Sequence, residues 1–185
     1  MASDPTKRKR VIEPRIDPTT KKMDVGGLLI PPTSLLTALL YGFAHHPKVV
    51  AREYYFWRIC DELWNHEDLP EPLMVRHPWA ERMIREALRN KYLSIGGSAS
   101  SGKSHTMAAW GIVNWLSQPR DTLVLMTSTT LREARKRIWG SVISLLSVIE
   151  GAPIKIRDSI GNAAYVDEKE TLIERAGLSL IAAER

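Results

Sequence analysis

The stretch that decides the fold class is Gly97-Ser98-Ala99-Ser100-Ser101-Gly102-Lys103-Ser104. It has the form G-x-x-x-x-G-K-S, which is the Walker A pattern of a phosphate-binding loop. Glycines at both ends allow the backbone to curl so that successive N–H groups point at phosphate oxygens. The small side chains at positions 98–101 leave room for a nucleotide to approach the backbone.

The residues at the end of this loop predict individual contacts. Lys103 is expected to contact the β- and γ-phosphates and to act as the catalytic cation, and the Ser104 hydroxyl is expected to ligate Mg²⁺. His105 follows directly and is included in the predicted nucleotide-binding segment. The loop therefore predicts a nucleoside triphosphate, ATP with Mg²⁺, as the ligand.

The flanks of the loop alternate between strand and helix patterns. Tyr92–Ile95 and Thr122–Thr127 read as strands, Lys103–Leu116 and Leu131–Ile149 read as helices, and Ile154–Ile156 begins a further strand. This order is typical of an α/β fold, here a P-loop NTPase with a parallel sheet flanked by helices. Because Thr122–Thr127 is nearly all apolar, we expect it to be covered on both faces.

Upstream of this core, residues 26–78 are expected to form a small helical subdomain or lid, and residues 79–185 the ATPase core. Helices are predicted at Ser34–Leu40, at Lys48–Trp64 and, opening the core, at Trp79–Asn90. The helical region also holds histidines and the single cysteine, but their spacing matches no zinc pattern. They are His45, His46, Cys60 and His66.

The first 25 residues are expected to form a flexible basic arm. Residues 1–24 hold seven Lys or Arg against four Asp or Glu, with three prolines. The run Lys7–Arg10 fits a nucleic-acid tether or a localisation signal, and equally a solvated tail. The net charge of +5 for the whole chain agrees with a polyanionic partner but names none. The sequence holds no apolar run of the ~18 residues that a membrane span needs.

Hydroxyl groups follow the second predicted strand at Thr127, Ser128 and Thr129. Ligands of open parallel sheets bind beyond the carboxyl ends of strands, so these hydroxyls are expected on the same edge as the loop. Thr130 is a natural N-cap for the next helix, with Glu133 completing a capping box. The cations that follow, Arg132 and Arg135 among them, fit either a contact to DNA or a solvated helix face.

The sequence offers one acidic pair for a Walker B role, Asp167 and Glu168, after the segment 163–166. The polar flanks and the two alanines favour a surface hairpin over a buried strand for this segment, with a turn at 160–162. If the pair is not catalytic, the chain is expected to end before its acidic strand and to be an N-terminal fragment with weak ATPase activity of its own.

Two quoted motifs carry a resemblance to a known family. Over residues 79–150 the chain resembles the ATPase domain of tailed-phage terminase large subunits. The resemblance rests on Gly-Gly-Ser-Ala-Ser-Ser-Gly-Lys-Ser-His-Thr (96–106) and on Leu-Val-Leu-Met-Thr-Ser-Thr-Thr-Leu-Arg-Glu-Ala-Arg (123–135). The resemblance implies a hydrolase that drives double-stranded DNA into a viral procapsid in the host cytoplasm. It also implies a homo-oligomeric ring working with the portal and a small terminase subunit.

The chain departs from that family in two places. Such ATPases usually carry an upstream glutamine that reads the adenine, yet no glutamine precedes Gln118, which leaves Trp79 or Arg82 to stack on the base. Many also place an arginine inside the loop, which is absent from positions 98–101. A charge-stabilising arginine must then come from elsewhere, with Arg132, Arg135 and Arg137 as candidates.

Other functions share these features. A helicase or remodelling ATPase fits the basic arm and the hydroxyl segment equally well. A nucleotide-dependent binding module that never hydrolyses fits if no Walker B acid exists, whereas a small-molecule kinase fits least because no acceptor-binding lid is evident.

Overall fold

A computed structural model describes the chain over eight ranges. They are residues 15–16, 23–25, 28–30, 34–98, 101–128, 130–149, 152–166 and 175–182. Near the N-terminus, three short antiparallel strands form a small sheet of order β1-β2-β3, whose β2 contacts helix α1. They are β1 (Arg15–Ile16), β2 (Met23–Val25) and β3 (Leu28–Ile30). Part of the segment expected to be a flexible arm is therefore extended and paired.

The helices of the first half of the chain fall close to where the sequence predicts them, although the first of them continues past the predicted Leu40 to His45. They are α1 (Leu35–His45), α2 (Val49–Trp64), α3 (Pro78–Arg89) and α4 (Lys103–Ser117). The start of α1 is fixed by Ser34, whose hydroxyl accepts a hydrogen bond from the Thr37 backbone N–H. Pro78 occupies the first turn of α3, where its missing N–H costs nothing.

The main sheet has four strands in the order β4-β7-β6-β5. Its strands are β4 (Leu123–Ser128), β5 (Ile154–Arg157), β6 (Asn162–Tyr165) and β7 (Gly177–Ala182). The fold is thus mixed α/β, as predicted, but the sheet is only partly parallel, because β4 and β7 are its one parallel pair. The cause is the turn at Asp158–Gly161, whose left-handed Gly161 (φ 62°) reverses the chain between β5 and β6.

β4 lies at an edge of this sheet and is covered on one face only. Leu123 and Leu125 are 47% and 51% exposed, while Met126 is buried on the other face. On that covered face α4 approaches closely, since a Cβ on Gly111 would meet the Val124 side chain at 3.1 Å. The expectation of a strand covered on both faces is therefore wrong.

The segment before the loop, Tyr92–Ile95, is not a strand. Tyr92 is 83% exposed, and none of the amides at 92–98 donates to another described backbone group. Four residues followed by two glycines form a strand only when a neighbouring strand pairs with them, and the described sheet supplies none. The strand that was predicted to lead into the phosphate-binding loop is thus an irregular extended segment.

The long helix predicted over Leu131–Ile149 is present but interrupted. It comprises α5 (Leu131–Ala134), the π-helical turn η1 (Arg135–Trp139) and α6 (Gly140–Leu146). Two side chains of η1 hold the turn between β5 and β6: Arg135 donates to the Ser159 carbonyl, and Trp139 Nε1 donates to Asp158 at 2.8 Å.

β6 is an interior strand even though it contains two consecutive alanines. The predicted hairpin is present, because β5 and β6 pair antiparallel on either side of the turn that contains Gly161. It is not on the surface, however: Ala163 and Ala164 are both buried, and β6 lies between β5 and β7. Small residues suit this site because the strands approach closely: Gly177 has φ 135°, and a Cβ there would lie 2.3 Å from the Ala163 carbonyl oxygen.

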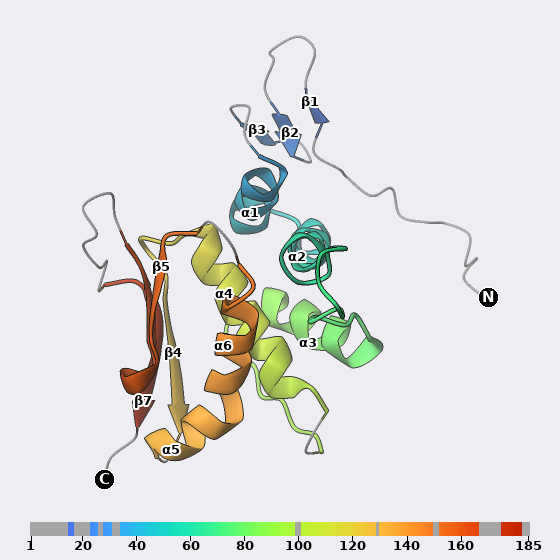
Figure 1. Ribbon diagram of the computed structural model, residues 1–185. Coiled ribbons are helices and arrows are strands. Elements are labelled where there is room, and N and C mark those ends of the chain that lie inside the picture. Colours follow the sequence, from blue (N-terminus) through green and yellow to red (C-terminus); the bar gives the residue numbers. More distant parts are fainter. Residues whose placement is uncertain are drawn as a thin grey trace, which may run out of the picture.

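The elements pack as layers around one continuous hydrophobic core that extends from α1 and α2 to β6 and β7. Figure 1 shows α4 and α6 against one face of the sheet, with α1, α2 and α3 beyond them. Trp64 of α2 links two of these layers, because its Nε1 donates to the Leu145 carbonyl of α6 at 2.9 Å. None of the helices in the described ranges is both long and apolar enough to cross a membrane.

Candidate functional site

The predicted loop lies directly before α4, and its last glycine is the N-cap of that helix. Gly102 has a left-handed backbone (φ 76°, ψ 2°), which a side-chain-bearing residue adopts only at a cost. The first backbone N–H groups of α4, from Lys103 on, have no partner within the helix and are available to an anion. Ala99 and Ser100 of the motif lie outside the described residues.

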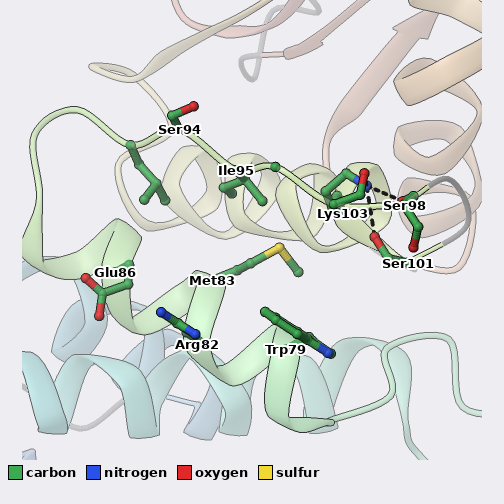
Figure 2. A pocket seen from close by; sticks show the side chains of 12 residues that line it. Trp79, Arg82, Met83, Glu86, Ser94, Ile95, Ser98, Ser101 and Lys103 are labelled. Carbon is green, nitrogen blue, oxygen red and sulfur yellow. Dashed lines mark hydrogen bonds between the residues drawn. The ribbon is translucent and has the colours of Figure 1, made fainter.

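Lys103 folds back over the loop that precedes it. Its ammonium donates to the Gly97 carbonyl (3.0 Å), the Ser98 carbonyl (2.5 Å) and the Ser101 hydroxyl (2.9 Å), and Figure 2 shows the last two side by side. Since an ammonium has three N–H bonds, the loop takes up its whole donor capacity. A bound phosphate would compete with these neutral acceptors for the same protons.

A groove with a volume of about 470 Å³ opens beside the loop. This is within the range of about 300–1,000 Å³ usual for ligand sites. One wall is α3 and the other is the irregular segment that leads into the loop, with Lys103 and Ser101 at one end (Figure 2). The lining residues are Trp79, Arg82, Met83, Glu86, Leu93, Ser94, Ile95, Gly96, Gly97, Ser98, Ser101 and Lys103.

The α3 wall is fixed in place from behind by an ion pair. Arg85 binds Glu53 of α2 through two hydrogen bonds, of 2.9 Å and 2.7 Å, and the Glu53 carboxylate is buried. These hydrogen bonds, together with the charge of the carboxylate, raise the pKa of Arg85 above its ordinary value. Ala80 and Ile84 add buried apolar contacts on the same side of the helix.

The first turn of α3 also lies next to the end of the loop Gly97–Ser104. His77 caps α3, since its Nδ1 accepts a hydrogen bond from the Ala80 N–H at 3.3 Å. Its other ring nitrogen, Nε2, lies near Gly102: a Cβ atom placed on Gly102 would be 3.8 Å from it. The first turn of α3 and the last glycine of the loop therefore lie close together.

Several predicted site residues lie elsewhere. His105 is turned away from the groove, and its Nε2 donates to the Leu73 carbonyl at 2.7 Å, because a carbonyl oxygen only accepts. This bond ties α4 to the connector between α2 and α3. Ser104 is exposed on the first turn of α4, beside Lys103 but outside the groove lining.

The segment after β4 does not line the groove either. Thr127 and Ser128 end β4 and are followed by Thr130, whose hydroxyl accepts from the Glu133 N–H at 3.2 Å, so the predicted N-cap is confirmed. The Glu133 carboxylate instead pairs with Arg137 at 3.1 Å. Because α4 and β4 are antiparallel and joined by a short turn, Ser128 and the loop lie toward the same end of the molecule (Figure 1).

The basic residues after β4 have different surroundings. Arg135 and Arg137 are each bonded to a neighbour, whereas Arg132 and Lys136, one helical turn apart, are exposed. Thr129, Asp167 and Glu168 lie outside the described residues. β6, which precedes the acidic pair, runs antiparallel to β7, so its carboxyl end is at the sheet edge opposite to the ends of β4 and β7.

Sequence reasoning missed Met83, Glu86 and the segment 93–96 as parts of the site. A signal for the first two was present: positions 79, 82, 83 and 86 have the i, i+3, i+4, i+7 spacing of one helix face. That face carries an aromatic ring, a cation and a carboxylate and is not simply apolar. No signal of this kind marked 93–96, because its apolar residues looked like those of a strand.

A second hollow, of about 830 Å³, lies where α2, α4 and α6 end. Its lining is mostly apolar and includes none of the predicted site residues. Nor do the described residues bring together three His, Cys, Asp or Glu side chains that would hold a metal ion.

Comparisons with known proteins add no assignment. No protein-family model matches the chain, and neither the curated proteins nor the solved structures compared with it include a match.

Proposed function

We propose that the chain binds ATP with Mg²⁺ at the loop Gly97–Ser104 and that it is the ATP-binding part of a P-loop ATPase that moves double-stranded DNA. The observation that carries the proposal is the groove, which ends at Lys103 and at the start of a 15-residue helix. A ligand seated there would place its phosphates at the loop and its remainder along α3.

The chemistry of phosphate binding follows from the contacts of Lys103. Its ammonium would exchange two neutral carbonyl acceptors for phosphate oxygens, whose negative charge attracts the ammonium more strongly than a carbonyl dipole does. The partial positive charge at the start of α4 acts in the same direction. Ser98, Ser101 and the glycines would follow the phosphates with their backbone N–H groups.

The residues present fit Mg²⁺ as well. The Ser104 hydroxyl is exposed beside Lys103, and Mg²⁺ in nucleotide sites takes few protein ligands, completing its shell with phosphate oxygens and water. The ion would neutralise charge on the phosphates. Of the described residues that line the groove, Glu86 alone is a carboxylate, and it lies at the end opposite Lys103 (Figure 2).

This placement of acids supports slow hydrolysis by the chain alone. A Walker B pair, for which Asp167 with Glu168 is the candidate in this sequence, and an arginine from a neighbouring subunit would be needed for full turnover. Such an arginine contributes roughly 10³–10⁵ in rate. The same observation favours one other candidate function, a nucleotide-dependent binding module that does not hydrolyse ATP.

For the DNA partner, the exposed cations Arg132 and Lys136 are the described residues that support the proposal best. By its resemblance to terminase large subunits, the chain would act as a ring in the host cytoplasm, with the portal and the small subunit. Binding to DNA through phosphates should weaken steeply with salt, by about 0.9 in log–log slope for each phosphate contact. Replacing Arg132 and Lys136 with alanine should make that slope shallower.

The nucleotide assignment is tested by titrating ATP with Mg²⁺ into Lys103→Ala and measuring heat release. We expect affinity to fall by about 100-fold or more, because a charged partner of the phosphates is lost. Lys155→Ala is the matched control, since this exposed lysine lies on β5 and should leave affinity unchanged. Equal affinities for the wild type and Lys103→Ala, with both folded, would contradict the assignment.

A further inference from the structure

The groove continues past the loop along one face of α3, and this outer part has its own chemistry. Trp79, Arg82, Met83 and Glu86 line it from below, and Ser94 and Ile95 from above (Figure 2); Leu93 is also in the lining. The face combines an aromatic ring, a cation and a carboxylate within two helical turns.

Trp79 is the most exposed of the large apolar side chains that line the groove, at 65%. The Arg82 guanidinium lies over its ring, 6.0 Å from the centroid, so the indole is already a surface on which a flat cation rests. Stacking of a nucleobase on an aromatic side chain is favourable and tolerates any base, because every base has a π-face. Trp79 is therefore suited to hold a base, and Met83 fills the floor beside it.

Glu86 supplies an acceptor at the far end of the groove. Its carboxylate accepts from Asn90 Nδ2 at 3.1 Å and faces Arg89 at 3.5 Å, both toward the C-terminal end of α3. Since a carboxylate has about four acceptor positions, it retains capacity toward the groove. Arg82, one turn earlier, has only donors to offer.

A donor and an acceptor one helical turn apart match one edge of adenine. Adenine presents the N7 acceptor next to the N6 amino donor, whereas guanine presents two acceptors, N7 and O6, on the same edge. Arg82 would donate to the ring nitrogen while Glu86 accepts from the amino group. Guanine in this position would direct an acceptor at the Glu86 carboxylate.

We propose that the outer part of the groove is a subsite for an amino-purine base, in which Trp79 stacks on the ring and Glu86 selects for the exocyclic amino group. This inference rests on the proposed function, because it takes the phosphates to lie at Lys103. It assigns the selection of the base to the Glu86 carboxylate on α3. The chain has no glutamine before Gln118 that could read the adenine instead.

The first experiment separates base binding from phosphate binding. Affinities for Mg²⁺–ATP and for Mg²⁺–tripolyphosphate are measured on the wild type, Trp79→Ala and Lys103→Ala. We expect Trp79→Ala to weaken ATP by about 10- to 100-fold and to leave tripolyphosphate unchanged. Tyr92→Ala is the matched control. Tyr92 is an exposed aromatic residue in the segment that forms the opposite wall, but its own side chain does not line the groove.

The second experiment tests the role of Glu86 with a nucleotide that lacks the amino group, purine riboside 5′-triphosphate. The wild type should bind ATP about 10-fold more tightly than this analogue, and Glu86→Ala should abolish the preference by weakening ATP. Glu81→Ala is the control, because Glu81 is on the same helix but pairs with Arg76 outside the groove. Thermal melts of each variant check that the fold is retained.

The outcomes distinguish the two proposals. If ATP and tripolyphosphate bind equally well and Trp79→Ala changes neither, the base subsite is wrong while the phosphate site stands. Tighter binding of GTP than of ATP, or an unchanged preference in Glu86→Ala, overturns the selection by Glu86. If Lys103→Ala binds both ligands normally, the proposed function fails, and the subsite built on it fails too.

Discussion

The two walls of the groove are built in different ways, although both contribute residues to one cavity. The α3 wall has regular backbone hydrogen bonds, a bidentate ion pair from Arg85 to Glu53 and buried contacts at Ala80 and Ile84. The wall at 92–98 has neither a partner strand nor backbone hydrogen bonds to other described residues. One wall is thus fixed before a ligand arrives, and the other has little to hold it except Lys103.

The difference assigns separate tasks to the two walls. A rigid surface that presents Trp79, Arg82 and Glu86 loses little conformational entropy when it binds a base, so it is the better place for selectivity. A wall whose amides are unpaired is free to adjust its N–H groups to phosphates. The contact of Lys103 with the Gly97 and Ser98 carbonyls would connect this adjustable wall to a nucleotide bound as proposed.

The largest expected effect concerns backbone hydrogen exchange in the two walls. Without nucleotide, amides at 93–97 should exchange at least about 10³-fold faster than that of Ile84, because they open without breaking backbone bonds. Adding Mg²⁺–ATP should slow the exchange of the amides at 93–97 markedly and that of the Ile84 amide little. Exchange is measured by mass spectrometry or NMR. Equal exchange rates in the two walls would show that the wall at 92–98 is as firmly held as α3.

The next effect compares two arginines of α3. Arg85→Ala should lower the free energy of unfolding by about 2 kcal/mol, since it leaves the buried Glu53 carboxylate without its partner. Arg82→Ala should change stability by less than about 0.5 kcal/mol, because Arg82 is exposed on the groove side. Urea denaturation of both variants measures the two free energies of unfolding. An Arg85→Ala protein as stable as the wild type would show that other contacts hold α3.

A smaller effect is expected at the junction of the loop and α4. Gly102→Ala should cost about 1 kcal/mol of stability, because φ 76° is unfavourable for alanine while the space for a Cβ is open. Affinity for ATP should also fall, by about tenfold, as the loop shifts toward a relaxed backbone. The same titration used for Lys103→Ala measures this, with Gly140→Ala, a helical glycine with open space around it, as the control.

The smallest effect is expected for the start of the adjustable wall. Tyr92→Ala should alter the free energy of unfolding by no more than about 0.5 kcal/mol, because its ring is almost fully exposed. Ile84→Ala in α3, by contrast, should cost about 2–5 kcal/mol through the cavity it leaves. A large loss in Tyr92→Ala would mean that this wall packs more firmly than its exposure indicates.

Much of the local structure follows from the sequence alone. The periodic apolar residues and caps of α1 to α4 define those helices to within a few residues, and Thr130 is the N-cap that its position after β4 predicts. The loop Gly97–Ser104 is recognisable because its chemistry depends on residue types at fixed spacing, which a sequence displays directly. These are local properties, set by residues within one or two turns of each other.

Tertiary structure decided the rest. Tyr92–Ile95 and Leu123–Ser128 are both short and apolar, yet only the second pairs with a strand among the described residues. Its partner is β7, whose residues lie 54 positions further along the chain, as Leu123 and Gly177 do. Ala163 and Ala164 form an interior strand because Gly177 allows the backbones to approach closely. The groove likewise involves α3, which Arg85 links to Glu53 of α2, 32 positions earlier in the chain. Pairing and burial of this kind depend on residues distant in sequence, so no local pattern reports them.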